Sequence, residues 1–161
     1  MVSFSSRLIC IIAILTYSQI SISQPDCLVP LRDPAKPCNL ELIGDRLTVN
    51  LDPEEVQQSK SELIGVTKGN VPASMQGGLV FDAYMMHRKS DRVPGQAVWT
   101  LRATHIYAGK ASAFRDNKIE VVSPSAQAGG AIFLSDRRYR VFAIELHGRL
   151  YVWDATIVQI K

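Results

Sequence analysis

Alternation of apolar and polar positions marks the chain from residue 79 onward. Short segments rich in β-branched and aromatic residues follow one another, separated by turn residues such as Pro94 and Gly148. The predicted strands are 79–87, 97–107, 118–122, 139–146 and 150–160. Because no helical pattern lies between them, these segments predict an antiparallel meander or a small barrel.

The alternation lapses in two of these strands, and each lapse predicts a structural feature. Along 97–107, strict alternation would place His105 inside the barrel and Ile106 outside. A one-residue bulge near Thr104 would restore the pattern, since a slip of one residue exchanges the two faces of a strand. Along 150–160 both faces are apolar, so we expect another part of the chain to cover the outer one.

The segment that we expect to provide this cover is 40–64, packed over Trp153. Burying an indole against aliphatic side chains would stabilise the fold. The candidate contacts on the covering segment are Leu47, Val49, Leu51 and Val56. The alternative is that Trp153 lies in an exposed apolar patch that faces a partner protein.

The inward positions of the strands define the expected core. These side chains should be buried together because they fall on the regular faces of their strands. They are Phe81, Trp99, Leu101, Val121, Val141, Leu150 and Val152.

The pattern is different upstream of the strands. Residues 24–39 hold four prolines, which disfavour both helix and interior strand, so we expect an extended lead-in without regular structure. Residues 40–51 alternate like a short strand. A helix is predicted from Pro53 to Ile64, because proline suits the first helical position, Asp52 can cap it, and two glutamates follow.

The first 23 residues have the pattern of a cleaved signal peptide. Arg7 gives a positive start, residues 8–17 are apolar, and small residues at Ser21 and Ser23 precede Gln24. The alternative is an uncleaved anchor, but the apolar run is about half of the ~20 residues that a spanning helix needs. We therefore expect a secreted, extracellular protein. Its expected parts are the signal peptide 1–23, the lead-in 24–75 and the barrel 76–161.

Cleavage would also settle which cysteines and charges remain. Cys27 and Cys38 would be the only cysteines left, and in an oxidising compartment they are expected to form one disulfide. Loss of Arg7 lowers the formal net charge from +3 to +2. Such mild basicity does not by itself predict nucleic-acid binding.

Signatures of catalysis or metal binding are missing from the sequence. The three histidines are scattered, without the spacing of a metal site, and no nucleophile elbow, P-loop or dinucleotide-binding glycine motif is present. We therefore expect no enzymatic activity, no cofactor and no metal ion.

Two basic clusters are the candidate interaction residues. One is expected in the loop after strand 79–87, and the other in the loop around the start of strand 139–146. Their members are Arg88, Lys89, Arg92, Arg137, Arg138 and Arg140. If both loops met at one end of the barrel, they would form an anion-attracting patch that binds polyanions weakly. The alternative is ordinary solvated loops, because Asp91 and Asp136 lie among the basic residues.

Residues 77–158 contain four consecutive segments: LVFDAYMMHRK, WTLRATHIYAG, IEVVSPSAQAGGAIFL and YRVFAIELHGRLYVWDATIV. In order and spacing they resemble the strands of the netrin-like module, best known as the inhibitory domain of the tissue inhibitors of metalloproteinases. The resemblance implies a mainly β fold, a small antiparallel OB-type β-barrel preceded by a cysteine-bearing segment. The predicted helix and the lead-in would precede this barrel.

The chain departs from this family at its cysteines. Gly129 stands where the family has a cysteine before Gly130, and Trp153 stands where the last strand has a cysteine before aspartate. In the inhibitors, the α-amine and carbonyl of an N-terminal cysteine chelate the zinc of the protease. Cleavage before Gln24 would leave three residues ahead of Cys27, which does not suit that mechanism.

The expected function is that of a secreted netrin-like binding module. It would act through its loops and barrel face on an extracellular protein or matrix component, with Trp153 as a further candidate contact and with neither nucleic acid nor membrane as partner. One alternative is a metalloprotease inhibitor, which would require a mature chain that starts at Cys27. The other is a carrier of small ligands, which would require an apolar cavity inside the strands.

Overall fold

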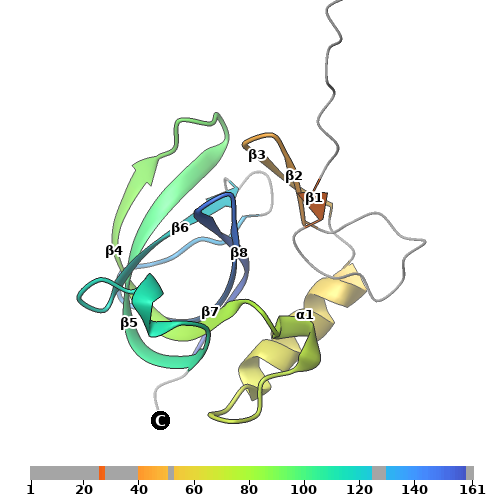
Figure 1. Cartoon of the computed structure of the whole chain (residues 1–161), viewed down its shortest axis with the longest axis vertical. Helices are drawn as coiled ribbons and strands as arrows, with labels where there is room; N and C mark the ends of the chain where they lie inside the picture. The colour runs from red at the N-terminus through yellow and green to blue at the C-terminus, as the bar shows by residue number, and fades with distance from the viewer. Residues whose placement is uncertain (1–25, 28–39, 51–52, 125–129, 159–161) are drawn as a thin grey trace, which may run out of the picture.

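The computed structural model describes residues 26–27, 40–50, 53–124 and 130–158. In this part of the chain a β-barrel lies beside a small N-terminal layer of one helix and three short strands (Figure 1). The barrel strands are β4 (Leu79–Ser90), β5 (Gln96–Ala108), β6 (Lys118–Pro124), β7 (Arg138–Leu146) and β8 (Arg149–Ile157).

The barrel closes in the order β4-β5-β6-β8-β7, and β7 pairs back onto β4. All of these pairings are antiparallel except the contact between β6 and β8, where Val122 lies opposite Tyr151. A three-stranded meander closed by a later hairpin in this way is the Greek-key arrangement of an OB-type barrel. The predicted fold class, a mainly β protein with a small OB-type barrel and one helix, is confirmed.

Strand β5 contains the predicted bulge. Asp82 of β4 lies opposite His105, and Ala83 lies opposite Ala103, so Thr104 is the extra residue on β5. Beyond the bulge, His105 is exposed and Ile106 packs against the barrel core. The one-residue slip therefore returns the apolar side chain to the interior, as the alternation pattern required.

Side chains fill the barrel interior. These side chains form one hydrophobic cluster. All seven residues of the predicted core belong to this cluster or pack against it, with Leu101 fully buried and Leu150 only partly buried. Phe133, from the segment before β7, adds an aromatic plug that contacts Trp99 and Tyr139 edge to face. A ligand carrier with an apolar cavity inside its strands is not supported, because this space is packed.

The N-terminal layer consists of β1 (Asp26–Cys27), β2 (Leu40–Ile43), β3 (Arg46–Val49) and α1 (Pro53–Gly65). The helix confirms the prediction from Pro53 onward. Residues 40–51 were expected to form one strand, and this was wrong, because the chain turns at Gly44, whose φ of 61° is readily adopted by glycine. The lead-in was expected to lack regular structure, yet Asp26 and Cys27 pair with β2.

The N-terminal layer covers the outer face of β8, as predicted. Leu40, Leu42 and Leu47 pack with Tyr151, and Trp153 contacts this cluster and also the cluster around Leu63 of α1. Leu51, one of the residues expected to contribute, lies outside the described residues. The barrel wall is therefore covered on both sides along β8.

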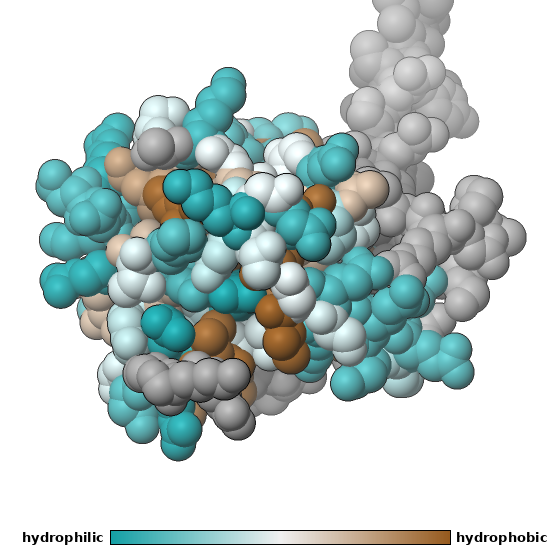
Figure 2. Space-filling model, turned by 90° about the horizontal axis from the view of Figure 1, so that it is seen from below, coloured by the Kyte–Doolittle hydropathy of each residue, from teal (hydrophilic) through white to brown (hydrophobic). Residues whose placement is uncertain are grey.

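Figure 2 shows mostly polar side chains on the face seen from below, with a smaller apolar group near its centre. Large exposed apolar side chains in the described ranges come from several separate elements. They are Ile43, Ile64, Met86, Ile132, Leu134 and Ile157.

Candidate functional site: a charged groove on the barrel face

A groove of about 570 Å³ lies on the outer face of β5 and β6. Three connections border it: the turn from β4 to β5, the connection from β5 to β6, and the turn from β7 to β8. Lining residues from these parts include Asp91, Arg115, Glu120, Gly148 and Arg149. In OB-type barrels this face and the loops after the first and fourth strands, here the β4–β5 and β7–β8 turns, are the common site for oligonucleotides and oligosaccharides.

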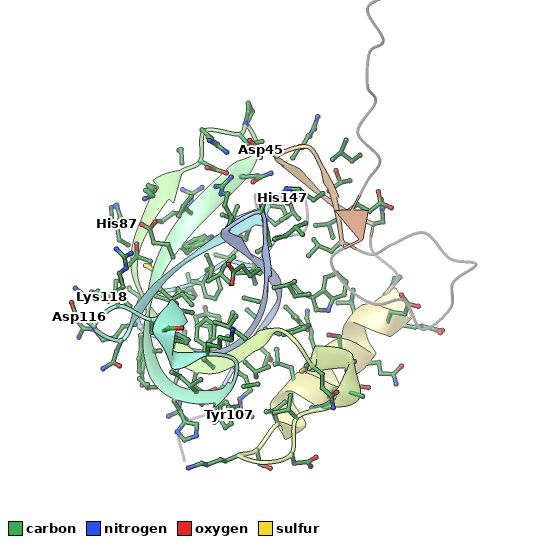
Figure 3. All side chains as sticks on the ribbon, viewed as in Figure 1. Asp45, His87, Tyr107, Asp116, Lys118 and His147 are labelled. Atoms are coloured by element: carbon green, nitrogen blue, oxygen red, sulfur yellow. The ribbon has the colours of Figure 1, made fainter. Side chains whose placement is uncertain are left out.

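The turn between β7 and β8 folds tightly enough to reach this groove. His147 and Gly148 have φ values of 50° and 72°, the left-handed pair that a two-residue hairpin turn requires. In Figure 3, His147 and the hairpin-tip residue Asp45 lie at the same end of the molecule, and Tyr107 lies at the other. The short turn thus presents Arg149 to the tip of the β4–β5 hairpin.

One ion pair joins the two hairpins beside the groove. Nη2 of Arg149 donates to both carboxylate oxygens of Asp91, each at 2.8 Å, and the Asp91 side chain is only 5% exposed. Burial alone would lower the pKa of Arg149, but its hydrogen bond to Asp91 and the charge of that carboxylate outweigh burial and raise the pKa. This ion pair therefore fixes the relative position of the two turns.

A second ion pair lies more openly in the groove. Nζ of Lys89 donates to Oε1 of Glu120 at 2.8 Å, and both side chains are more than half exposed. An exposed pair of this kind contributes only about 0–1 kcal/mol to stability, so its partners can be exchanged at little cost. Lys89 and Glu120 are therefore free to bind groups of a ligand instead of each other.

The ionised residues that line the groove are balanced in charge. Among the described residues, three are basic and three are acidic: Lys89, Arg115, Arg149, Asp91, Glu120 and Glu145. A strong field of one sign is what attracts a polyanion, and the groove lacks it. The site instead suits a ligand that itself carries both signs.

The β2–β3 hairpin bounds the groove on one side. Nη2 of Arg92 donates to the Asp45 carboxylate at 2.8 Å, and Nε2 of Gln96 donates to the Asp45 carbonyl oxygen at 3.1 Å. Val98 and Val122 pack under the hairpin and also line the groove. The N-terminal layer thus occupies part of the barrel face and leaves the charged part open.

The structure places the first predicted basic cluster near this groove. Lys89 lines it, Arg92 is bound to Asp45 beside it, and the Arg88 guanidinium lies 5.4 Å from the centre of the Trp99 ring. Two of these three cations therefore have acidic partners.

The second cluster does not join the first in one patch. Arg137 pairs with its neighbour Asp136 at 3.5 Å, and Nε of Arg138 is buried with no hydrogen-bond partner among the described residues. Arg140 was expected in a surface loop, and this was wrong, because it lies within β7 and is only 9% exposed. Ion pairing and burial thus weigh against an anion site built from both clusters.

Arg140 instead binds the helix to the barrel. Its Nε donates to Oδ1 of Asp82 at 2.8 Å, and its Nη1 donates to the carbonyl oxygens of Ile64 and Val66, both at 2.8 Å. Its Nη2 donates to the Tyr107 hydroxyl at 2.6 Å. A guanidinium at the C-terminal end of a helix also interacts favourably with the helix dipole.

The electrostatics of this cluster are those of a structural contact. Burial raises the pKa of Tyr107, and the adjacent Asp82 carboxylate raises it further. Burial would lower the pKa of Arg140, but Asp82 outweighs it and raises the pKa. Tyr107 is therefore a neutral hydrogen-bonding group at physiological pH, and Arg140 forms a buried ion pair with Asp82. The sequence held one indication of this buried contact, because Asp82 interrupts an otherwise apolar strand.

Trp153 lies between the helix and the barrel. Its Nε1 donates to Oγ of Ser59 on α1 at 3.2 Å, and its ring contacts two apolar clusters. The indole thus makes its contacts within the chain.

The predicted disulfide between Cys27 and Cys38 stays a prediction, because Cys38 lies outside the described residues.

The described residues contain no group of three or more His, Cys, Asp or Glu that could hold a metal ion. Within the same ranges, no helix is long and apolar enough to cross a membrane. No protein-family model matches the chain, and no curated protein matches its sequence. The geometry of the barrel face is therefore the basis for assigning a function.

Proposed function

We propose that the chain is a secreted netrin-like binding module that binds an extracellular protein through the groove on β5 and β6. The observation that carries this proposal is the charge-balanced groove between three barrel connections. The OB-type barrel supports it, because folds of this type bind their ligands on this face. The resemblance to the netrin-like module supports the extracellular setting.

A protein segment is the ligand class that fits best. The groove offers both cationic and anionic side chains, which match a peptide segment with charges of both signs. Lys89 and Glu120 can form ion pairs with such a segment in place of their mutual one. A polyanion such as a glycosaminoglycan would meet three carboxylates in the same groove, each of which would repel it.

Inhibition of a metalloprotease by an N-terminal cysteine is not favoured. That mechanism needs the cysteine at the free end of the chain, where its amine and carbonyl can reach a zinc ion. Here the Asp26–Cys27 strand pairs with β2, with Cys27 opposite Glu41. In this register Cys27 belongs to a strand of the N-terminal layer.

The test exchanges the charges of the exposed pair. The variant Lys89→Glu with Glu120→Lys keeps an ion pair but reverses the polarity that a partner meets. The mature wild-type chain, this double variant and the control Lys68→Glu, outside the groove, would be immobilised and exposed to conditioned medium. Quantitative mass spectrometry would then compare the bound proteins.

The proposal expects an extracellular protein whose binding is lost in the double variant and retained in the control. Its affinity for the purified mature chain would then be measured by calorimetry, with a heparin oligosaccharide as the polyanion for comparison. Equal binding of the partner by wild type and double variant would contradict the groove. Tight binding of heparin alone would contradict the choice of a protein partner.

A further inference from the structure

An apolar pocket of about 300 Å³ lies between the N-terminal layer and β8, away from the charged groove. Leu40 and Val49 of the hairpin and Val56 of α1 form one side. Val152 and Trp153 of β8 form another. The volume is at the lower end of the range for sites that bind small molecules.

Gly130 and Ile132 close the pocket beside the end of β6. A Cβ built on Gly130 would lie 2.0 Å from the carbonyl oxygen of Pro124, so the backbones touch here and a side chain is excluded. This close contact gives the pocket a rigid wall made of main chain.

A bulge in β8 turns a carboxylate toward the pocket. Asp154 lies opposite Phe142 while Val152 lies opposite Ala143, so Trp153 is an extra residue on β8. Val152 belongs to the barrel interior and Trp153 to the outer clusters. The extra residue places both Trp153 and Asp154 on the side of the N-terminal layer. Bulges are known to redirect side chains next to active sites.

One oxygen of the Asp154 carboxylate is left without a partner by the described residues around it. The residue is 8% exposed, and its Oδ2 is buried without a hydrogen-bond partner among the described residues. Burial raises the pKa of this carboxyl, while the charge of Lys60 and hydrogen bonds from the Ala155 backbone and Ser59 lower it in part. A buried polar atom left without a partner costs free energy, which a donor from a ligand would recover.

We propose that this pocket binds a small molecule with an apolar body and one primary amine, whose ammonium group donates to Oδ2 of Asp154. The aliphatic side chains would contact the body of the ligand. The Trp153 ring would lie beside the charge and attract it through its electron-rich face. The proposal does not depend on the proposed partner of the groove.

The charges around the pocket favour an amine over an acid or a hydrocarbon. A carboxylic acid would place a second anion next to Asp154, and a hydrocarbon would leave Oδ2 without a donor. Among the described residues that line the pocket, Lys60 is the one that is basic, and its ammonium opposes a second cation. Removal of that charge is therefore expected to strengthen the binding of an amine.

Three probes of similar shape test the proposal on the mature chain. They are 2-phenylethylamine, propylbenzene and 3-phenylpropionate, titrated at constant ionic strength with the indole fluorescence of a Trp99→Phe background as readout. We expect the amine to bind, the hydrocarbon to bind more weakly, and the acid to bind least. Asp154→Asn should weaken amine binding about tenfold or more and leave propylbenzene unchanged. Lys60→Gln should strengthen amine binding.

A second variant keeps the test valid if Asp154→Asn does not fold. Val56→Phe fills the pocket from α1 and retains Asp154, whereas Ile64→Phe adds the same ring at a site that is 60% exposed. Amine binding should be lost in the first and kept in the second. Equal affinity for the amine and the hydrocarbon, or no saturation by any probe at millimolar concentration, would overturn the proposal.

Discussion

Two arginines three residues apart show how strongly the surroundings determine the role of a residue. Arg137 is an exposed partner of Asp136, whereas Arg140 donates to Asp82, to Tyr107 and to carbonyl oxygens at the end of α1. An exposed pair is worth little, but an arginine removed from a buried pair leaves an uncompensated charge.

Arg140→Ala should therefore be the most damaging change among the six basic candidates. We expect a loss of about 3–5 kcal/mol in the free energy of unfolding, because Asp82 would remain buried without its cationic partner. Arg137→Ala should cost no more than about 0.5 kcal/mol. Urea denaturation of both variants measures the difference, and equal losses would contradict the structural role of Arg140.

Asp154 should influence stability in a pH-dependent way. A carboxyl group whose pKa is raised by folding holds its proton more tightly in the folded state. Above the folded pKa, the ionised Asp154 carboxylate therefore lowers the free energy of unfolding. The loss is about 1.4 kcal/mol for each unit by which folding raises the pKa of Asp154. This cost disappears as the pH falls to the unfolded pKa. The neutral isostere Asp154→Asn should be more stable than wild type at pH 7.

The same comparison at lower pH distinguishes this cause from a general effect of the substitution. Melting temperatures of wild type and Asp154→Asn, measured from neutral pH down to about pH 4, should converge as the wild-type carboxyl becomes protonated. If the difference in melting temperature stayed constant or grew toward acidic pH, the ionisation of Asp154 would not be its cause.

At the scale of elements, local patterns predicted most of the barrel. The bulge at Thr104 followed from the lapse in alternation, and the cover over Trp153 followed from a strand that is apolar on both faces. The error at 40–51 has a local cause as well. Its apolar positions change phase across Gly44, which a single strand does not allow and a hairpin turn does.

Two glycines of the N-terminal layer should respond to alanine with opposite signs. Gly44 has a φ of 61°, so Gly44→Ala should cost about 1–2 kcal/mol through left-handed backbone strain alone, since no atom lies within 4 Å of the added Cβ. Gly65 ends α1 without a positive φ and also has open space around it. Gly65→Ala should stabilise the protein by about 0.4–1 kcal/mol.

Chemical denaturation of the two alanine variants separates these cases. Both substitutions add one methyl group in open space, so each serves as the control for the other. Destabilisation of equal size at both positions would mean that the turn at Gly44 does not have the left-handed geometry on which the hairpin depends.

At the scale of the whole molecule, the sequence named single members of the candidate sites, Lys89 and Trp153, but did not show which residues lie around them. The groove brings together residues as distant as Asp91 and Arg149, and the pocket joins Val56 to Asp154. Such contacts depend on strand register and on how the N-terminal layer docks, and neither has a local signal. Asp154 itself turns toward the pocket because of one extra residue in β8.

The docking of the N-terminal layer can be followed through Trp153. In a Trp99→Phe background, the emission of the mature chain should be blue-shifted and shielded from iodide, because the indole packs against both apolar clusters and donates to Ser59. Removal of residues 24–65 should shift the emission to the red and expose the indole to iodide, since it takes away the helix and the hairpin.

Circular dichroism of the shortened chain would show whether the barrel strands remain, so that exposure of Trp153 is not confused with unfolding. Should the shortened chain unfold, Leu63→Ala provides a milder change, because Leu63 is fully buried in the same cluster as Trp153 and its loss should loosen α1. A red-shifted, readily quenched Trp153 in the intact chain would contradict the docked layer. It would equally remove one wall of the proposed amine pocket, because that pocket exists only while α1 and the hairpin rest on β8.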